Sequence, residues 1–178
     1  IGCTLSDNAQ SGVSVHYNSG YTELSDSLIE NNNATGALLS YVEGDGTYVV
    51  TGNTIRKNKG GNYTGIEIST RAPVVFKDNL VIENGPGYGL ATVLIQAHAA
   101  EITGNLVINN DGGGMQLGSY YDYLPNVRVV SNNIISDNNG IGLRLDSIGG
   151  STVNASHNAI LRNTAVNDAG LTVLYLDA

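Results

Sequence analysis

The sequence predicts an all-β fold, a single-stranded parallel β-helix in which one domain of about seven coils spans residues 1–178. Three observations predict it. A hexapeptide, N-x-h-x-x-N with h apolar, recurs seven times, and successive copies start 24 to 28 residues apart. A short alternating segment follows the hexapeptide, and a β-branched segment precedes the next copy. Three short strands in about 26 residues leave no room for a helix and describe one coil of a solenoid.

The hexapeptide predicts two asparagine ladders in the turns. Its first position is Cys3, Ser27, Asn53, Asn79, Asn105, Asn133 and Asn158. Its last position is Asn8, Asn32, Asn58, Asn84, Asn110, Asn138 and Asn163. Equivalent residues of successive coils stack about 4.8 Å apart, and a side-chain amide both donates and accepts hydrogen bonds, so each column can satisfy itself. We interpret both columns as structural; a row of ligands for sugar or metal is the alternative.

The second strand of each coil is predicted directly after a glycine. These glycines are Gly12, Gly36, Gly65, Gly114, Gly142 and Gly170, and we expect each to allow a positive φ at the corner. The strands that follow them are 13–15, 37–39, 66–68, 115–117, 143–145 and 171–173. Residues 87–95 of the fourth coil are apolar throughout, so alternation does not indicate which of their side chains face inward. The third strand is predicted at 48–51, 74–77, 101–103 and 127–130.

Composition limits the partners. The formal net charge is −8 and the pI is about 4.6, so no basic surface is expected to bind nucleic acid or an anionic membrane. No apolar run approaches the roughly 18 residues of a membrane span.

The single cysteine, Cys3, cannot form an internal disulfide. We expect it to be a packed thiol, with a bond to another chain as the alternative.

The repeats NTIRKNKGGNYTGIEI, NLVINNDGGGMQL and NNIISDNNGIGLRL resemble the right-handed parallel β-helix repeats of the pectate-lyase-like superfamily. The resemblance covers almost the whole chain, and it agrees with the right-handed rule for parallel crossovers. It implies the fold and a range of activities, because that superfamily contains polysaccharide lyases, glycoside hydrolases, alginate epimerases, phage tailspikes and surface proteins. The catalytic patterns of its lyases, polygalacturonases and epimerases are not recognised in this chain.

The strand after each glycine presents the candidate binding face. One outward row is Ser14, Leu38, Glu67, Gln116, Arg144 and Thr172, and a second row is His16, Ser40, Ser69, Gly118, Asp146 and Leu174. Glu67, Gln116 and Arg144 have the chemistry to bind hydroxyls or a uronate, and Arg144 and Asp146 are adjacent on one strand. A solvated face with an incidental ion pair is the alternative.

The stretch Tyr120-Tyr121-Asp122-Tyr123 falls in the coil lengthened to 28 residues and is predicted to form a protruding loop. Exposed aromatic rings stack on sugar faces, so Tyr120, Tyr121 and Tyr123 are candidate sugar-binding residues. The alternative is a loop that packs its rings on the coil. Three N-x-S/T tripeptides place possible glycosylation sites at Asn33, Asn62 and Asn154.

No cofactor or metal is expected. The three histidines, His16, His98 and His157, fall in different coils, which does not favour a shared metal site. His157 directly precedes a ladder position and is predicted to be a corner residue.

Two functions remain open. The first is an extracellular module that binds or processes polysaccharide along the outward strand face and the tyrosine loop. The second is a structural surface, adhesin or filament module, a rigid rod roughly 34 Å long. A hexapeptide begins at Cys3 and a strand is predicted at 171–173, with no capping helix beside either. We therefore expect the chain to be part of a longer solenoid or to associate end to end with copies of itself.

Overall fold

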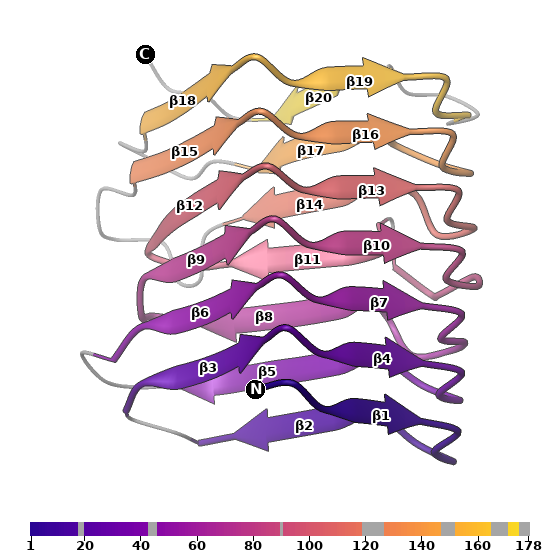
Figure 1. Ribbon diagram of the computed structural model, residues 1–178. Helices are drawn as coiled ribbons and strands as arrows, with labels where there is room; N and C mark the ends of the chain where they lie inside the picture. Colours follow the sequence, from indigo (N-terminus) through magenta and orange to yellow (C-terminus); the bar gives the residue numbers. More distant parts are fainter. Residues whose placement is uncertain are drawn as a thin grey trace.

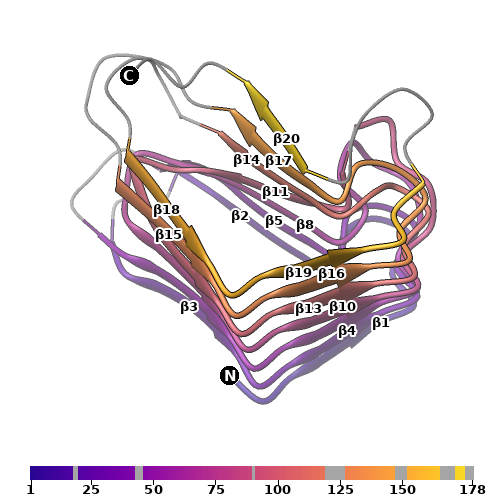
Figure 2. The ribbon, with the colours of Figure 1, turned by 90° about the horizontal axis from the view of Figure 1, so that it is seen from above.

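The structure is a computed structural model that describes residues 1–17, 20–42, 46–89, 91–118, 127–146, 152–164 and 171–174. Three parallel sheets wind around one interior, and each strand pairs with its equivalent one coil away (Figures 1 and 2). The predicted all-β parallel solenoid with three strands per coil is confirmed.

Sheets A and B have seven strands each in the described residues, and sheet C has six. Sheet A contains β1 (Thr4–Ser6), β4 (Leu28–Glu30), β7 (Thr54–Arg56), β10 (Leu80–Ile82), β13 (Leu106–Ile108), β16 (Ile134–Ser136) and β19 (Ala159–Leu161). Sheet B contains β2 (Val13–His16), β5 (Ala37–Val42), β8 (Ile66–Thr70), β11 (Val93–Gln96), β14 (Met115–Gly118), β17 (Leu143–Asp146) and β20 (Leu171–Leu174). Sheet C contains β3 (Thr22–Ser25), β6 (Tyr48–Thr51), β9 (Val74–Lys77), β12 (Ala99–Thr103), β15 (Val127–Ser131) and β18 (Thr152–Ser156).

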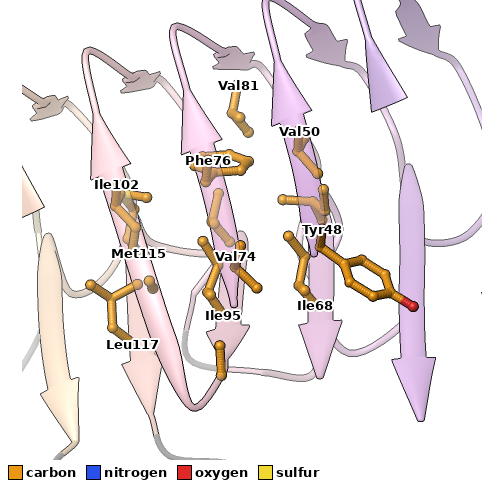
Figure 3. Packing of buried hydrophobic residues seen from close by; sticks show 14 of the residues in the cluster. Tyr48, Val50, Ile68, Val74, Phe76, Val81, Ile95, Ile102, Met115 and Leu117 are labelled. Carbon is orange, nitrogen blue, oxygen red and sulfur yellow. The ribbon is translucent and has the colours of Figure 1, made fainter. Parts of the chain in front are cut away.

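Apolar side chains from all three sheets fill the interior (Figure 3). The central residue of each sheet A strand points inward, and Ile29, Ile55 and Val81 are fully buried. They meet inward residues of the other sheets, such as Ile68 of sheet B and Phe76 of sheet C. The alternation of inward and outward residues therefore follows the period of two that the sequence predicts.

Both asparagine ladders are present. The Asn58 backbone N–H and the Asn58 Nδ2 both donate to Asn84 Oδ1, at 3.1 and 3.0 Å. The Asn84 Nδ2 donates in turn to Asn110 Oδ1 and to the Ile55 carbonyl oxygen, each at 3.0 Å. Because each buried amide uses its donors and its acceptor between coils, the structural interpretation of the columns is confirmed. Cys3 is exposed in the first coil, so the expectation of a packed thiol is wrong.

A residue in the left-handed region precedes every ladder position. Before the first ladder these residues are Gly2, Asp26, Gly52, Asp78, Gly104, Asn132 and His157, with φ from 50 to 69°. Before the second ladder they are Asp7, Asn31, Lys57, Glu83, Asn109, Asp137 and Arg162, with φ from 50 to 58°. The prediction that His157 is a corner residue is confirmed. Each left-handed residue turns the chain, so that the next asparagine points into the corner.

The glycines before the sheet B strands have a different role from the predicted one. The φ angles of Gly12, Gly36, Gly65 and Gly114 lie outside the left-handed region, so the expectation of a positive φ at these positions is wrong. A Cβ on Gly36 would lie 2.6 Å from the Gly65 carbonyl oxygen and 2.8 Å from the Asn58 Nδ2. These glycines are required because the next coil and the ladder approach the backbone too closely for a side chain.

Candidate functional site

The outer face of sheet B carries the two predicted rows in register. Ser14 pairs with Leu38 and Leu38 with Glu67 in the first row, while His16, Ser40 and Ser69 align in the second. The sequence did not indicate which residues of β11 face outward. In the structure Leu94 lies in the first row between Glu67 and Gln116, and Gln96 lies in the second row between Ser69 and Gly118. We call this outward surface of β2, β5, β8, β11, β14 and β17 the sheet B face.

Three predicted site residues form one hydrogen-bonded group on this face. Arg144 Nε donates to both carboxylate oxygens of Asp146, at 2.8 and 3.0 Å. Gln116 Nε2 donates to Asp146 Oδ2 at 2.8 Å, which links β14 to β17. The side chains of Arg144 and Asp146 are 22% and 23% exposed, so the ion pair is partly removed from water. The group presents a cation, a carboxylate and an amide on one half-buried surface.

Glu67 lies apart from this group on β8. Burial raises the pKa of its carboxyl group, and the charge of His16 partly opposes that rise. The His16 ring is hydrogen-bonded on both sides, because Nε2 and Nδ1 each lie 2.7 Å from a serine hydroxyl, of Ser14 and Ser40 respectively. Polar side chains therefore continue along the face towards β2.

The apolar side chain of Leu94, only 3% exposed, separates Glu67 from the Arg144 group. Glu67 and Asp146 belong to strands three spacings apart, which is about 14 Å along the sheet. A glycosidase that uses two carboxylates needs them about 5 to 9.5 Å apart. Asp146 is also already bound to Arg144 and Gln116. These two residues are therefore better suited to contact a ligand than to cleave it together.

Two further residues interact with the charges of this face but were not predicted as site residues; Tyr63 is half-buried, and Arg128 is a buried residue of β15 in sheet C. Burial raises the pKa of the half-buried Tyr63 hydroxyl, Glu67 and Asp146 raise it further, and Arg144 opposes them. Tyr63 lies in the turn before β8, where the repeat pattern gives no signal for it. Arg128 is 2% exposed and donates from Nη2 to the Gly118 carbonyl oxygen at 2.7 Å. Burial lowers the pKa of Arg128, and the negative charge of the nearby Asp146 partly opposes that fall.

The raised pKa of Glu67 makes a testable prediction about stability. Because the pKa of Glu67 is higher in the folded protein than in the unfolded chain, protonation of this carboxyl group favours the folded state. This contribution to stability is fully present below the unfolded pKa and is lost as the pH rises through the folded pKa. We expect Glu67→Gln, which does not titrate, to be more stable than the wild type near pH 7, with the difference disappearing near pH 4. Melting temperatures of both proteins across this pH range test it. A constant difference would show that burial of the charge is not the cause.

The remaining predicted residues are placed only in part. Tyr120, Tyr121 and Tyr123 lie outside the described residues, so their sugar-binding role stays a prediction. The side chains of Asn33, Asn62 and Asn154 are exposed, the first two in turns and the third on β18, and their glycosylation is still a prediction.

The described part of the chain contains no group of three histidine, cysteine, aspartate or glutamate side chains placed to hold a metal ion. His16 lies on β2, His98 directly before β12, and His157 at a corner after β18. Within the same described residues, no helix has the length and hydropathy needed to cross a membrane.

The fold and the ladders agree with comparison to known families. The family described as "Right handed beta helix region" matches this chain over residues 1–132 and again over residues 41–177. The chain belongs to this family of right-handed parallel β-helix proteins. Comparison with curated proteins and with solved structures gives no match for this chain.

Proposed function

We propose that this β-helix is an extracellular module that binds polysaccharide along the sheet B face. The observation that carries the proposal is the hydrogen-bonded group of Gln116, Arg144 and Asp146. Its donors and acceptors are fixed between two strands, which reduces the entropy lost when a ligand is bound. In the second row, His16 is exposed and Gln96 is partly exposed, and both add polar groups suited to hydroxyls.

The geometry favours binding over hydrolysis. An extended polysaccharide lying across the strands would contact equivalent positions in several coils, because these are spaced evenly along the face. The face offers Arg144 for a carboxylate or sulfate group, and Glu67 and Gln116 for hydroxyls. The wide separation of Glu67 and Asp146 supports a ligand that remains intact.

A structural rod is the second candidate, and the continuous ladders favour it. In the second ladder each asparagine from Asn8 to Asn138 donates to the asparagine of the next coil. A scaffold braced in this way can act as a spacer without any ligand. A rod of this kind needs no polar group on the sheet B face, which is why ligand binding distinguishes the two functions.

A glycan array probed with the labelled wild-type protein tests the proposal. We expect saturable binding to at least one class of polysaccharide, and loss of that signal in Arg144→Ala. The variant Tyr121→Ala tests the predicted contribution of residues 120–123 in the same experiment. An array without any saturable signal would contradict the proposal and favour the structural rod.

A further inference from the structure

The chain contains two Asn-Gly pairs, Asn84-Gly85 and Asn139-Gly140, and they lie in different surroundings. An asparagine followed by glycine is prone to deamidation, because no Cβ on the next residue hinders attack of its backbone nitrogen on the side-chain amide. The attack needs an amide that can turn towards that nitrogen, and it needs access for water. The burial and hydrogen bonds of the two asparagines therefore decide which of them can react.

Asn84 belongs to the second ladder and is 1% exposed. Its Oδ1 accepts from the backbone N–H and the Nδ2 of Asn58, and its Nδ2 donates to Asn110 Oδ1 and to the Ile55 carbonyl oxygen. The Gly85 backbone N–H, whose nitrogen would have to attack, donates to the Asn58 carbonyl oxygen at 2.8 Å. Deamidation of Asn84 therefore requires these contacts between coils to open first.

Asn139 lies one residue beyond the ladder, in the turn between β16 and β17, and it is exposed (Figure 1). Its Oδ1 accepts from the exposed Thr164 hydroxyl at 3.1 Å, and its Nδ2 has no hydrogen bond to any described residue. An exposed hydrogen bond of this kind exchanges readily with water. The Gly140 backbone N–H donates to the Asn138 carbonyl oxygen within the same turn, and not to a neighbouring coil. The Asn139 amide can thus turn towards Gly140 without breaking a ladder contact.

We propose that Asn139 is a site of spontaneous deamidation in the folded protein. The Gly140 nitrogen loses its proton to water or hydroxide and forms a bond to Asn139 Cγ, and the side-chain nitrogen leaves as ammonia. Water then opens the cyclic succinimide at either carbonyl carbon, which gives aspartate or isoaspartate. The reaction consumes water, releases ammonia and involves no change of oxidation state. It does not depend on polysaccharide binding at the sheet B face.

The product alters both the charge and the backbone of this turn. The backbone N–H groups of Asp111 and Asn139 make the same hydrogen bond to the preceding coil, so deamidation places carboxylates on neighbouring coils whose backbones are about 4.8 Å apart. Isoaspartate also inserts one carbon atom into the backbone between two such bonds. These are the bond from the Asn139 N–H to the Asn110 carbonyl oxygen and the bond from the Gly114 N–H to the Ile141 carbonyl oxygen. The change falls in the turn that leads into β17.

The proposal is tested by incubating the intact protein in ¹⁸O-labelled water at mildly alkaline pH, followed by peptide mass spectrometry. Deamidation during the incubation introduces ¹⁸O, and fragmentation assigns the label to a residue. Both Asn-Gly pairs are followed in folded protein and in denaturant, where only the local sequence sets the rate. We expect the Asn139 rate in the folded protein to stay within about tenfold of its rate in denaturant. The Asn84 rate is expected to fall at least about a hundredfold, because the ladder must open locally before the amide can react.

The matched variant is Asn139→Gln, which keeps an exposed amide. Its side chain is one methylene group longer, so the ring closes far more slowly and the label at residue 139 is expected to disappear. Absence of label at Asn139 in the folded protein, with normal labelling in denaturant, would overturn the proposal. Equal rates at Asn84 and Asn139 in the folded protein, or label that persists at residue 139 in Asn139→Gln, would overturn it as well.

Discussion

Asn84→Asp is expected to lower the free energy of unfolding by about 4 kcal/mol near pH 7. Asn84 is 1% exposed, and its Nδ2 donates to Asn110 Oδ1 and to the Ile55 carbonyl oxygen. The substitution keeps the shape of the side chain but places a carboxylate against those two acceptors. Chemical denaturation of both proteins measures the loss.

The same variant has a distinctive pH dependence. The two Asn58 donors still face one carboxylate oxygen, but burial and the two acceptors that face the other oxygen raise the folded pKa of the introduced carboxyl group above its ordinary value of about 3.9. Its protonated form can donate to one of those two acceptors. We therefore expect the stability deficit to be complete above the raised pKa and to shrink as the pH falls towards about 4. A deficit that is independent of pH would contradict the ladder as its cause.

Asn109→Asp is the matched control, because it makes the same chemical change at an exposed position. Asn109 is a left-handed corner residue with a φ of 55°, and the equivalent positions in two other coils are Asp7 and Asp137. Aspartate is thus already accepted in that conformation. We expect stability close to that of the wild type at every pH.

Gly114→Ala is expected to destabilise the protein by about 3 kcal/mol, near the upper end of the usual overpacking cost. The added Cβ would collide with the Gly142 carbonyl oxygen and lie 2.5 Å from Ile135 Cγ2. A backbone oxygen held in a parallel sheet cannot move away as a side-chain tip can. Thermal and denaturant unfolding measure the effect.

The control for this variant is Gly118, the last residue of β14, which is the strand that Gly114 directly precedes. A Cβ on Gly118 would meet no atom closer than 3.5 Å, which is ordinary contact, so Gly118→Ala should be tolerated. Equal losses for Gly114→Ala and Gly118→Ala would show that general strand flexibility, rather than close approach of the next coil, explains the glycine column.

The sequence predicts the ladders and the strand rows well because these features repeat in every coil. The stacking partner of Asn84 can be read from the spacing to Asn58 and Asn110, and the outward positions of Glu67, Gln116 and Arg144 follow from alternation. The family resemblance adds handedness, which periodicity alone does not determine.

Features that occur once were harder to predict. Leu94 falls in an apolar run whose inward side the alternation rule cannot identify, and only its pairing with Glu67 and Gln116 shows that it lies on the sheet B face. Tyr63 lies in a turn, where the repeat pattern gives no signal for it. The glycine column has a steric cause that becomes visible only when neighbouring coils are placed together.

The central proposal is that the sheet B face binds polysaccharide, and two arginines on different faces test it directly. Arg144 pairs with Asp146 on sheet B at 2.8 Å, and Arg56 pairs with Glu30 on sheet A at 2.7 Å. The measurement is the affinity of Arg144→Ala and of Arg56→Ala, by isothermal titration calorimetry, for a polysaccharide that the wild type binds. We expect at least about tenfold weaker binding for Arg144→Ala and wild-type affinity for Arg56→Ala. Wild-type affinity in Arg144→Ala, or the same loss in both variants, would contradict the proposal.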